Sequence, residues 1–157
     1  HLITRQAGTW VRVPLPRGAR LTSLVLDQKD QPWVGLSDGT VARMDGPRFI
    51  EVRQQPPDCA GDPCDAAVTT MTRGARGGLW LGDGRGGLWR SDGGPPAVVG
   101  RVEGRVLALR EEEDGSLWVA TPRGLHRVRG GDVRRFGKEH GLLTDEVLAI
   151  VADDAGW

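Results

Sequence analysis

Short apolar stretches separated by turn-forming residues recur along the whole chain. Four of them align without internal gaps: LTSLVLDQKDQPW from Leu21, VTTMTRGARGGLW from Val68, VLALREEEDGSLW from Val106 and VLAIVADDAGW from Val147. In each stretch a second apolar residue stands three residues after the first, which gives the pairs Leu21/Leu24, Val68/Met71, Val106/Leu109 and Val147/Ile150. Self-similarity of this kind predicts a repeat architecture.

A tryptophan marks the same place in the first three copies. Trp33, Trp80 and Trp118 each stand twelve residues after the first aliphatic residue of their copy. The residue three before the tryptophan is a glycine or an aspartate, namely Asp30, Gly77 and Gly115. Gly156 takes that place in the fourth copy, so its tryptophan is expected at position 159 and Trp157 is not the repeat tryptophan.

The segment after each tryptophan repeats as well. It contains a turn, an aliphatic residue and an arginine two residues later, which gives Val41/Arg43, Leu88/Arg90 and Leu125/Arg127. A last short apolar stretch follows, RFIEV, PAVVGRV or DVRRF. The D-G, G-G and R-G dipeptides at the joints supply the positive φ that tight hairpin turns require. Each unit is therefore predicted to hold four short strands.

Four-stranded units of about 40 residues are typical of β-propeller blades. The chain is predicted to be all-β and to hold about three full blades of a larger propeller. We expect the recurring tryptophans to fill the space between blades and the recurring arginines to be structural. The expected organisation is an outer strand of a preceding blade (1–20), blade 1 (21–53), a cysteine-containing loop (54–67), blade 2 (68–105), blade 3 (106–146) and the first strand of a truncated fourth blade (147–157).

Composition narrows the possible functions. The 157 residues include 21 Lys and Arg against 21 Asp and Glu, so the net charge is zero and nucleic acid is not an expected partner. No apolar run reaches the roughly 20 residues that a membrane helix needs. The chain opens at His1 rather than at a methionine, and is expected to be a piece of a longer protein.

The repeats resemble the two-component regulator propeller family. GSLWVATPRGLHRV (115–128) and HGLLTDEVLAIVADDAG (140–156) carry the likeness, whereas Asp30, Pro32 and Gly74 depart from its pattern. The resemblance implies a periplasmic sensor domain, anchored through a membrane segment outside this chain, that feeds a histidine kinase or sometimes a diguanylate cyclase. The implied partners are the remaining propeller blades and a small-molecule, glycan or peptide ligand, with a homodimer as a further possibility.

Cys59 and Cys64 lie together in the long loop after the first unit. Their C-x4-C spacing, without a second pair, does not favour zinc. A disulfide would suit an oxidising compartment such as the periplasm. Two free thiols are the alternative, and a metal site is the least favoured.

The sequence contains no motif for a cofactor. GDGRGG (82–87) has the G-x-G-x-x-G spacing of a dinucleotide site, but LWRSDGGPP follows it and cannot form the required helix. A blade turn explains these glycines. We therefore expect no cofactor and no metal.

Ligands of propellers commonly bind to the loops at the mouth of the central channel, here 53–66, 83–86 and 137–146. Arg85, Glu139 and His140 are the candidate ligand-binding residues of these loops. The acidic run Glu111–Asp114 and the basic run Arg123–Lys138 are close in sequence. We expect the basic run to form a solvated face of outer strands that meets acids of the neighbouring blade.

Two other functions remain open. A propeller can serve as a protein-interaction scaffold without signalling. A lyase or glycosidase would need catalytic residues, and His126 and His140 could act as an acid–base pair only if they met in space. No motif places a nucleophile beside either histidine, so a non-catalytic sensor is the preferred hypothesis.

Overall fold

The chain folds into stacked four-stranded antiparallel sheets. The computed structural model describes residues 2–6, 9–15, 19–53 and 66–151. Its elements are β1 (Leu2–Gln6), β2 (Thr9–Val13), β3 (Leu21–Leu26), β4 (Pro32–Leu36), β5 (Val41–Asp45), β6 (Arg48–Arg53), β7 (Val68–Arg73), β8 (Leu79–Asp83), β9 (Gly87–Ser91), β10 (Ala97–Arg101), β11 (Ala108–Glu111), β12 (Leu117–Thr121), β13 (Gly124–Arg129), β14 (Asp132–Phe136) and the 3-10 turn η2 (Lys138–His140). The all-β prediction is confirmed.

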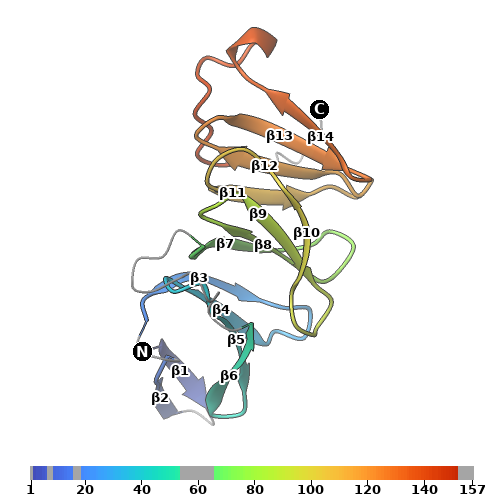
Figure 1. Cartoon of the computed structure of the whole chain (residues 1–157). Helices are drawn as coiled ribbons and strands as arrows, with labels where there is room; N and C mark the ends of the chain where they lie inside the picture. The colour runs from blue at the N-terminus through green and yellow to red at the C-terminus, as the bar shows by residue number, and fades with distance from the viewer. Residues whose placement is uncertain (1, 7–8, 16–18, 54–65, 152–157) are drawn as a thin grey trace.

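Each sheet is a simple meander. Blade 1 is β3-β4-β5-β6, blade 2 is β7-β8-β9-β10 and blade 3 is β11-β12-β13-β14, all with antiparallel neighbours. The blades follow one another in chain order along the molecule (Figure 1). β7 contacts both β3 and β11, so the first strands of the three blades lie side by side. This is the arrangement by which propeller blades surround an axis.

The turn before each repeat tryptophan explains the glycine or aspartate found there. Gly77 and Gly115 have φ values of 98° and 83°, and Asp30 has a φ of 56°. Positive φ is readily adopted by glycine and is tolerated by aspartate better than by most residues. The same turn therefore forms in all three blades although the sequence differs.

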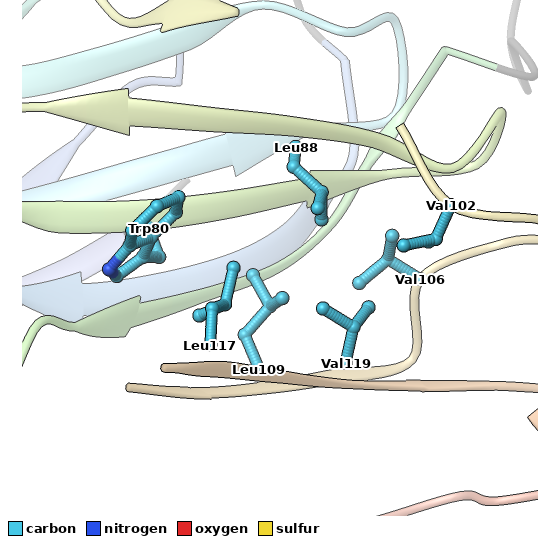
Figure 2. Close-up of a cluster of buried hydrophobic side chains, with 7 residues drawn as sticks. All are labelled: Trp80, Leu88, Val102, Val106, Leu109, Leu117 and Val119. Carbon is cyan, nitrogen blue, oxygen red and sulfur yellow. The ribbon is translucent and has the colours of Figure 1, made fainter. Parts of the chain in front are cut away.

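Apolar side chains fill both junctions between blades. Between blades 1 and 2, Trp33 and Val41 pack with Val68, Met71, Leu79 and Leu81. Between blades 2 and 3, Figure 2 shows Trp80 and Leu88 facing the valines and leucines of the next blade and its connection. Trp33 and Trp80 are 0% and 7% exposed. Each tryptophan thus lies against the blade that follows its own.

Small residues allow close approach at the same junctions. A Cβ added to Gly35 would lie 2.6 Å from a methyl carbon of Val68, and one added to Gly82 would lie 2.3 Å from a methyl carbon of Val106. Both glycines stand two residues after the repeat tryptophan, where blade 3 has Ala120. The first aliphatic residue of each repeat therefore packs onto the backbone of the preceding blade.

Neither end of the described chain forms a four-stranded blade. The segment before blade 1 holds two strands, because β1 and β2 pair as a hairpin and satisfy each other's backbone groups. At the other end, residues 147–151 form no strand, since none of the described segments pairs with them. Val147 N–H still donates to Thr121 O at 3.0 Å, as Val106 N–H donates to Asp83 O at 3.1 Å one blade earlier.

Candidate ligand-binding face

The meander places the loops at two opposite ends of each blade. The turns between second and third strands (37–40, 84–86 and 122–123) lie at the same end as the connections from one blade to the next (102–107 and 137–146). We call this the connection end. The turns between first and second strands and between third and fourth strands lie at the other end, which we call the hairpin end.

Asp83 organises the connection end of blade 2. Its carboxylate accepts hydrogen bonds from the backbone N–H groups of Arg85 at 2.9 Å and Gly87 at 2.8 Å, and from Trp89 Nε1 at 2.9 Å. The Asp83 side chain is buried. Three donors on one carboxylate hold the 84–86 turn in a single shape and fix Arg85 at its tip.

Arg53 joins this turn to blade 1. Its guanidinium carbon lies 3.9 Å from the centroid of the Trp89 ring, and Nη1 donates to Gly39 O at 3.0 Å. Burial lowers the pKa of Arg53, while the negative charge of Asp83 raises it. A stacked arginine of this kind orders two neighbouring blades at the connection end.

Ion pairs tie the loops around blade 3 together. Arg123 pairs with Glu103 of the preceding connection at 3.2 Å, and Arg135 pairs with Glu139 of η2 at 3.3 Å. Arg135 also donates from Nη1 to Arg123 O at 3.2 Å. These groups are largely exposed, so each pair contributes little stability. Their value is to position polar groups next to one another.

The structure places the three candidate ligand-binding residues at the connection end. Glu139 and His140 are adjacent and exposed, with Glu139 Oε1 3.3 Å from His140 Nδ1. Arg85 is half-buried in the turn of blade 2, so it lies in a different blade from the other two. A cation, a carboxylate and an imidazole at one end of the stack can hydrogen-bond a polar ligand.

His126 and His140 lie on opposite faces of blade 3. His140 packs against Phe136, which packs against Trp118, with ring centroids 5.6 Å apart in both pairs. Trp118 pairs directly with Arg127 across β12 and β13, so His126 next to Arg127 points to the other face. The structure therefore does not bring the two histidines together as an acid–base pair.

The three recurring arginines stand directly opposite the three tryptophans. The paired residues are Arg43 with Trp33, Arg90 with Trp80, and Arg127 with Trp118. Arg90 also forms an ion pair with Glu111 of blade 3 at 3.2 Å. Arg127 instead uses Asp114 of its own blade at 3.1 Å. The expectation that the basic run meets acids of a neighbouring blade is wrong for Arg127, because Asp114 in the adjacent turn is nearer.

Sequence reasoning missed the role of Glu111. Its side chain is only 4% exposed and accepts from Arg90 Nη1 and from the backbone N–H of Arg76. Glu111 stands within an acidic run, so nothing in its local sequence distinguishes it from its solvated neighbours. Asp27 accepts from Trp33 Nε1 at the same separation of six residues, but Asp27 follows the first strand of its blade and Asp83 ends the second, so the repeat does not predict the Asp83–Trp89 contact.

A shallow hollow of about 340 Å³ lies at the hairpin end, opposite the connection end. Lys29, Gln31, Pro32, Met44 and Gly46 line it, and they belong to the hairpin end of blade 1. It therefore offers a binding region separate from Arg85, Glu139 and His140.

Some predicted features fall outside the described residues. Cys59, Cys64, Gly156 and Trp157 lie outside the described ranges. Within those ranges there is no group of three His, Cys, Asp or Glu residues that could hold a metal ion. The described part of the chain also contains no helix long and apolar enough to cross a membrane.

Stacked four-stranded antiparallel blades with their first strands side by side define a β-propeller fold. Solved structures support this class. The extracellular domain of BT4673 from B. thetaiotaomicron, a proposed one-component or hybrid two-component system, superposes on 97% of this chain with a TM-score of 0.76 and 17% identity. The extracellular domain of BT3049, a proposed hybrid two-component system of the same organism, covers 82% with a TM-score of 0.63 and 16% identity.

Enzymes share the fold as well. Virginiamycin B lyase from Staphylococcus aureus covers 85% of the chain with a TM-score of 0.66 and 18% identity. The chain spans only 22% of the BT4673 domain, 20% of the BT3049 domain and 47% of the lyase. No protein-family model and no curated protein matches the sequence. At these identities the likeness shows the fold.

Proposed function

We propose that the chain is part of the extracytoplasmic sensing propeller of a bacterial signalling receptor of the two-component type. The observation that carries the proposal is the likeness over 97% of the chain to the extracellular domain of BT4673. The repeat motifs support it independently, since they resemble the same class of receptor. In this proposal the chain binds a ligand or partner and an output domain elsewhere in the protein performs the catalysis.

The connection end is the proposed ligand-binding face. Asp83 and Arg53 order the turn that carries Arg85, and the Arg135–Glu139 pair orders the segment that carries His140. The polar groups there suit a glycan, a peptide or another polar small molecule. Function in a propeller depends on such a site rather than on the fold itself.

Further blades are the proposed structural partners. Trp118 occupies the repeat position of Trp33 and Trp80 but is half-exposed, on the face of blade 3 away from blade 2. Val147 already makes the hydrogen bond to Thr121 that begins the next junction. A fourth blade starting at Val147 would bury Trp118 in the way that blade 3 buries Trp80.

The test uses thermal unfolding of the 157-residue chain with panels of oligosaccharides and short peptides, each at about 1 mM so that weak binding still shifts the midpoint. We expect one class to raise the midpoint, and Arg85→Ala or His140→Ala to remove the shift. Lys29→Ala, in the hollow at the hairpin end, is the matched control and should keep it. A shift that survives in both connection-end variants but is lost in Lys29→Ala would overturn the proposed face.

The sequence on either side of residues 1 and 157 separates signalling from a scaffold role. A receptor requires a membrane span and an output domain, whereas an interaction scaffold requires neither. Further repeats with a tryptophan at position 159 would support the larger propeller. A parent gene that encodes only blades would overturn the signalling proposal and favour the scaffold.

The lyase likeness keeps an enzyme as the second candidate. If the parent protein degrades a candidate substrate, His126→Ala and His140→Ala test the two histidines of this chain. Unchanged turnover in both would exclude them, as their placement on opposite faces of blade 3 leads us to expect.

A further inference from the structure

His126 is buried in the junction between blades 2 and 3. It lies on β13, is 2% exposed, and is directly opposite Val119 of β12 and Arg135 of β14. Val119 belongs to the apolar cluster that also contains Val102 and Val106 of the connection from blade 2. The imidazole therefore occupies the same face of blade 3 as the packing that holds the two blades together.

One nitrogen of this imidazole is unsatisfied. Nδ1 is buried and has no hydrogen-bond partner among the residues that the structure describes. In the neutral imidazole one of the two nitrogens carries no proton, and the unpartnered Nδ1 can be that nitrogen. In the protonated ring both nitrogens carry a proton, and a buried N–H without an acceptor costs roughly 1–3 kcal/mol.

The charged groups that act on His126 come from β14 and from the connection between blades 2 and 3. Arg135 on β14, directly opposite His126, is the cation that acts on the ring, and it is itself paired with Glu139 of η2. Glu103 on the connection from blade 2 is the acidic group that acts on the ring, but it is paired with Arg123 of the β12–β13 turn. Like charges on directly opposed strand residues destabilise a sheet, and His126 and Arg135 become such a pair only when the ring is protonated.

The balance of these effects favours the neutral ring. Burial and the charge of Arg135 lower the pKa of His126, and they outweigh the backbone hydrogen bonds of Val119 and Gly124 and the charge of Glu103, which raise it. The unfolded chain has none of this environment. It takes up the proton near pH 6.5, where histidine ordinarily titrates.

We propose that His126 makes the junction between blades 2 and 3 acid-sensitive, because a proton on its imidazole weakens the packing of blade 3 against the Val102–Val106 connection. The stability that the neutral ring allows is complete above about pH 6.5. It falls as the pH drops below that value, since the open state binds a proton that the closed junction excludes. The loss ends once the closed junction also takes up the proton. This inference is independent of any ligand.

Amide hydrogen exchange of the 157-residue chain, corrected for intrinsic rates, tests the proposal. Between pH 7.5 and 5.5 we expect faster exchange in 102–107 and β12–β13, with an opening equilibrium that rises by up to about tenfold per pH unit because one proton is taken up. His126→Gln should remove this pH dependence. His140→Gln, which changes the exposed histidine of the same blade, should keep it. A pH dependence that persists in His126→Gln, or that is absent from the unmodified chain, would overturn the proposal.

A second variant keeps the test valid if His126→Gln does not fold. Arg135→Gln removes the cation that opposes protonation of His126, so the closed junction accepts the proton more easily. The acid-induced rise in exchange should then become smaller than in the unmodified chain, while the exchange of β3–β6 in blade 1 stays unchanged. An equal or larger rise in Arg135→Gln would contradict the proposed role of His126.

Discussion

Apolar side chains pack in the same way at the two junctions between blades. The buried polar group that lacks a hydrogen-bond partner differs between them. At the junction of blades 1 and 2, Trp33 Nε1 donates to Asp27 Oδ2 at 3.0 Å, whereas Arg43 Nε is buried without a hydrogen-bond partner among the described residues. At the junction of blades 2 and 3 the situation is reversed. Trp80 Nε1 is the buried group without a described partner, and Arg90 is paired with Glu111.

Gly74 explains this exchange. It stands where blade 1 has Asp27, so blade 2 lacks the carboxylate that would bind its tryptophan. A Cβ at Gly74 would lie 2.6 Å from Glu111 Oε2 and closer still to the carbonyl oxygen of Gly77. The space of the repeat aspartate is thus occupied by a carboxylate from the following blade, which binds the arginine in place of the indole. The repeat specifies the apolar positions, and each junction completes its polar groups separately.

The largest expected effect comes from the buried repeat tryptophan. Trp33→Ala should lower the free energy of unfolding by roughly 3–5 kcal/mol, the usual cost of removing a fully buried aromatic residue. Trp118→Ala removes a half-exposed ring and should cost clearly less. Urea denaturation of both variants measures the difference, and equal losses would show that Trp118 is as well packed as Trp33.

Adding a carboxylate at position 74, in the second junction, should have the next largest effect on the free energy of unfolding. Gly74→Asp places a second acid against Glu111, and overpacking of this kind typically costs about 1–3 kcal/mol. In the double variant Gly74→Asp with Glu111→Ala, the new aspartate can accept from Trp80 Nε1. Unfolding of the two single variants and the double variant should show coupling, with the double less destabilised than the sum. Strict additivity would contradict the shared space.

The carboxylate of the first junction should give a smaller, pH-dependent effect. Burial raises the pKa of Asp27, but hydrogen bonds from the Gln31 N–H, Trp33 Nε1 and the Lys29 N–H lower it below its usual value. The stability that this lowered pKa provides is present above about pH 4, near the ordinary value for aspartate, and is lost as the pH falls through the lowered value. Asp27→Asn should therefore destabilise the chain at pH 7, and its difference from the unmodified chain should shrink below pH 4.

Arg43→Met is expected to have the smallest effect. Arg43 Nε makes no described hydrogen bond, so an apolar side chain of similar length removes a buried polar atom without leaving a partner unpaired. The change in unfolding free energy should stay within about 0.5 kcal/mol. Arg90→Met, at the equivalent position, leaves buried Glu111 without its ion pair and should cost more. A similar loss in both variants would remove the contrast between the junctions.

The fold was predictable because its signals are local and repeated. Trp33, Trp80 and the turn residues Asp30, Gly77 and Gly115 recur at fixed spacing, and spacing alone indicates four-stranded units. One outer strand is the expectation for residues 1–20, whereas the structure pairs β1 with β2 in a two-stranded sheet. The roles of Glu111 and Arg53 could not be predicted, since each contacts a residue of another blade that no local pattern identifies.

The candidate site was predictable only in part. Arg85, Glu139 and His140 lie in the predicted loops 83–86 and 137–146, and the meander puts both loops at the connection end. The sequence did not indicate that Asp83 fixes the Arg85 turn or that Arg53 stacks on Trp89. These contacts depend on the registers of β8 with β9 and on the distance between neighbouring blades.

The hydrogen bonds from Trp33 to Asp27 and from Trp89 to Asp83 have a consequence for the folding of the chain. Each hydrogen bond joins residues only six positions apart, so the entropic cost of closing the loop is small. The bond can therefore form before any neighbouring blade has packed against the hairpin. Chains built from similar units risk pairing a strand with the wrong copy of its partner. In such a hairpin the hydrogen bond between its own aspartate and tryptophan sets the register of the two strands. This disfavours pairing with the equivalent strand of another blade. These two hydrogen bonds would thus protect correct strand pairing among units that share the same apolar pattern.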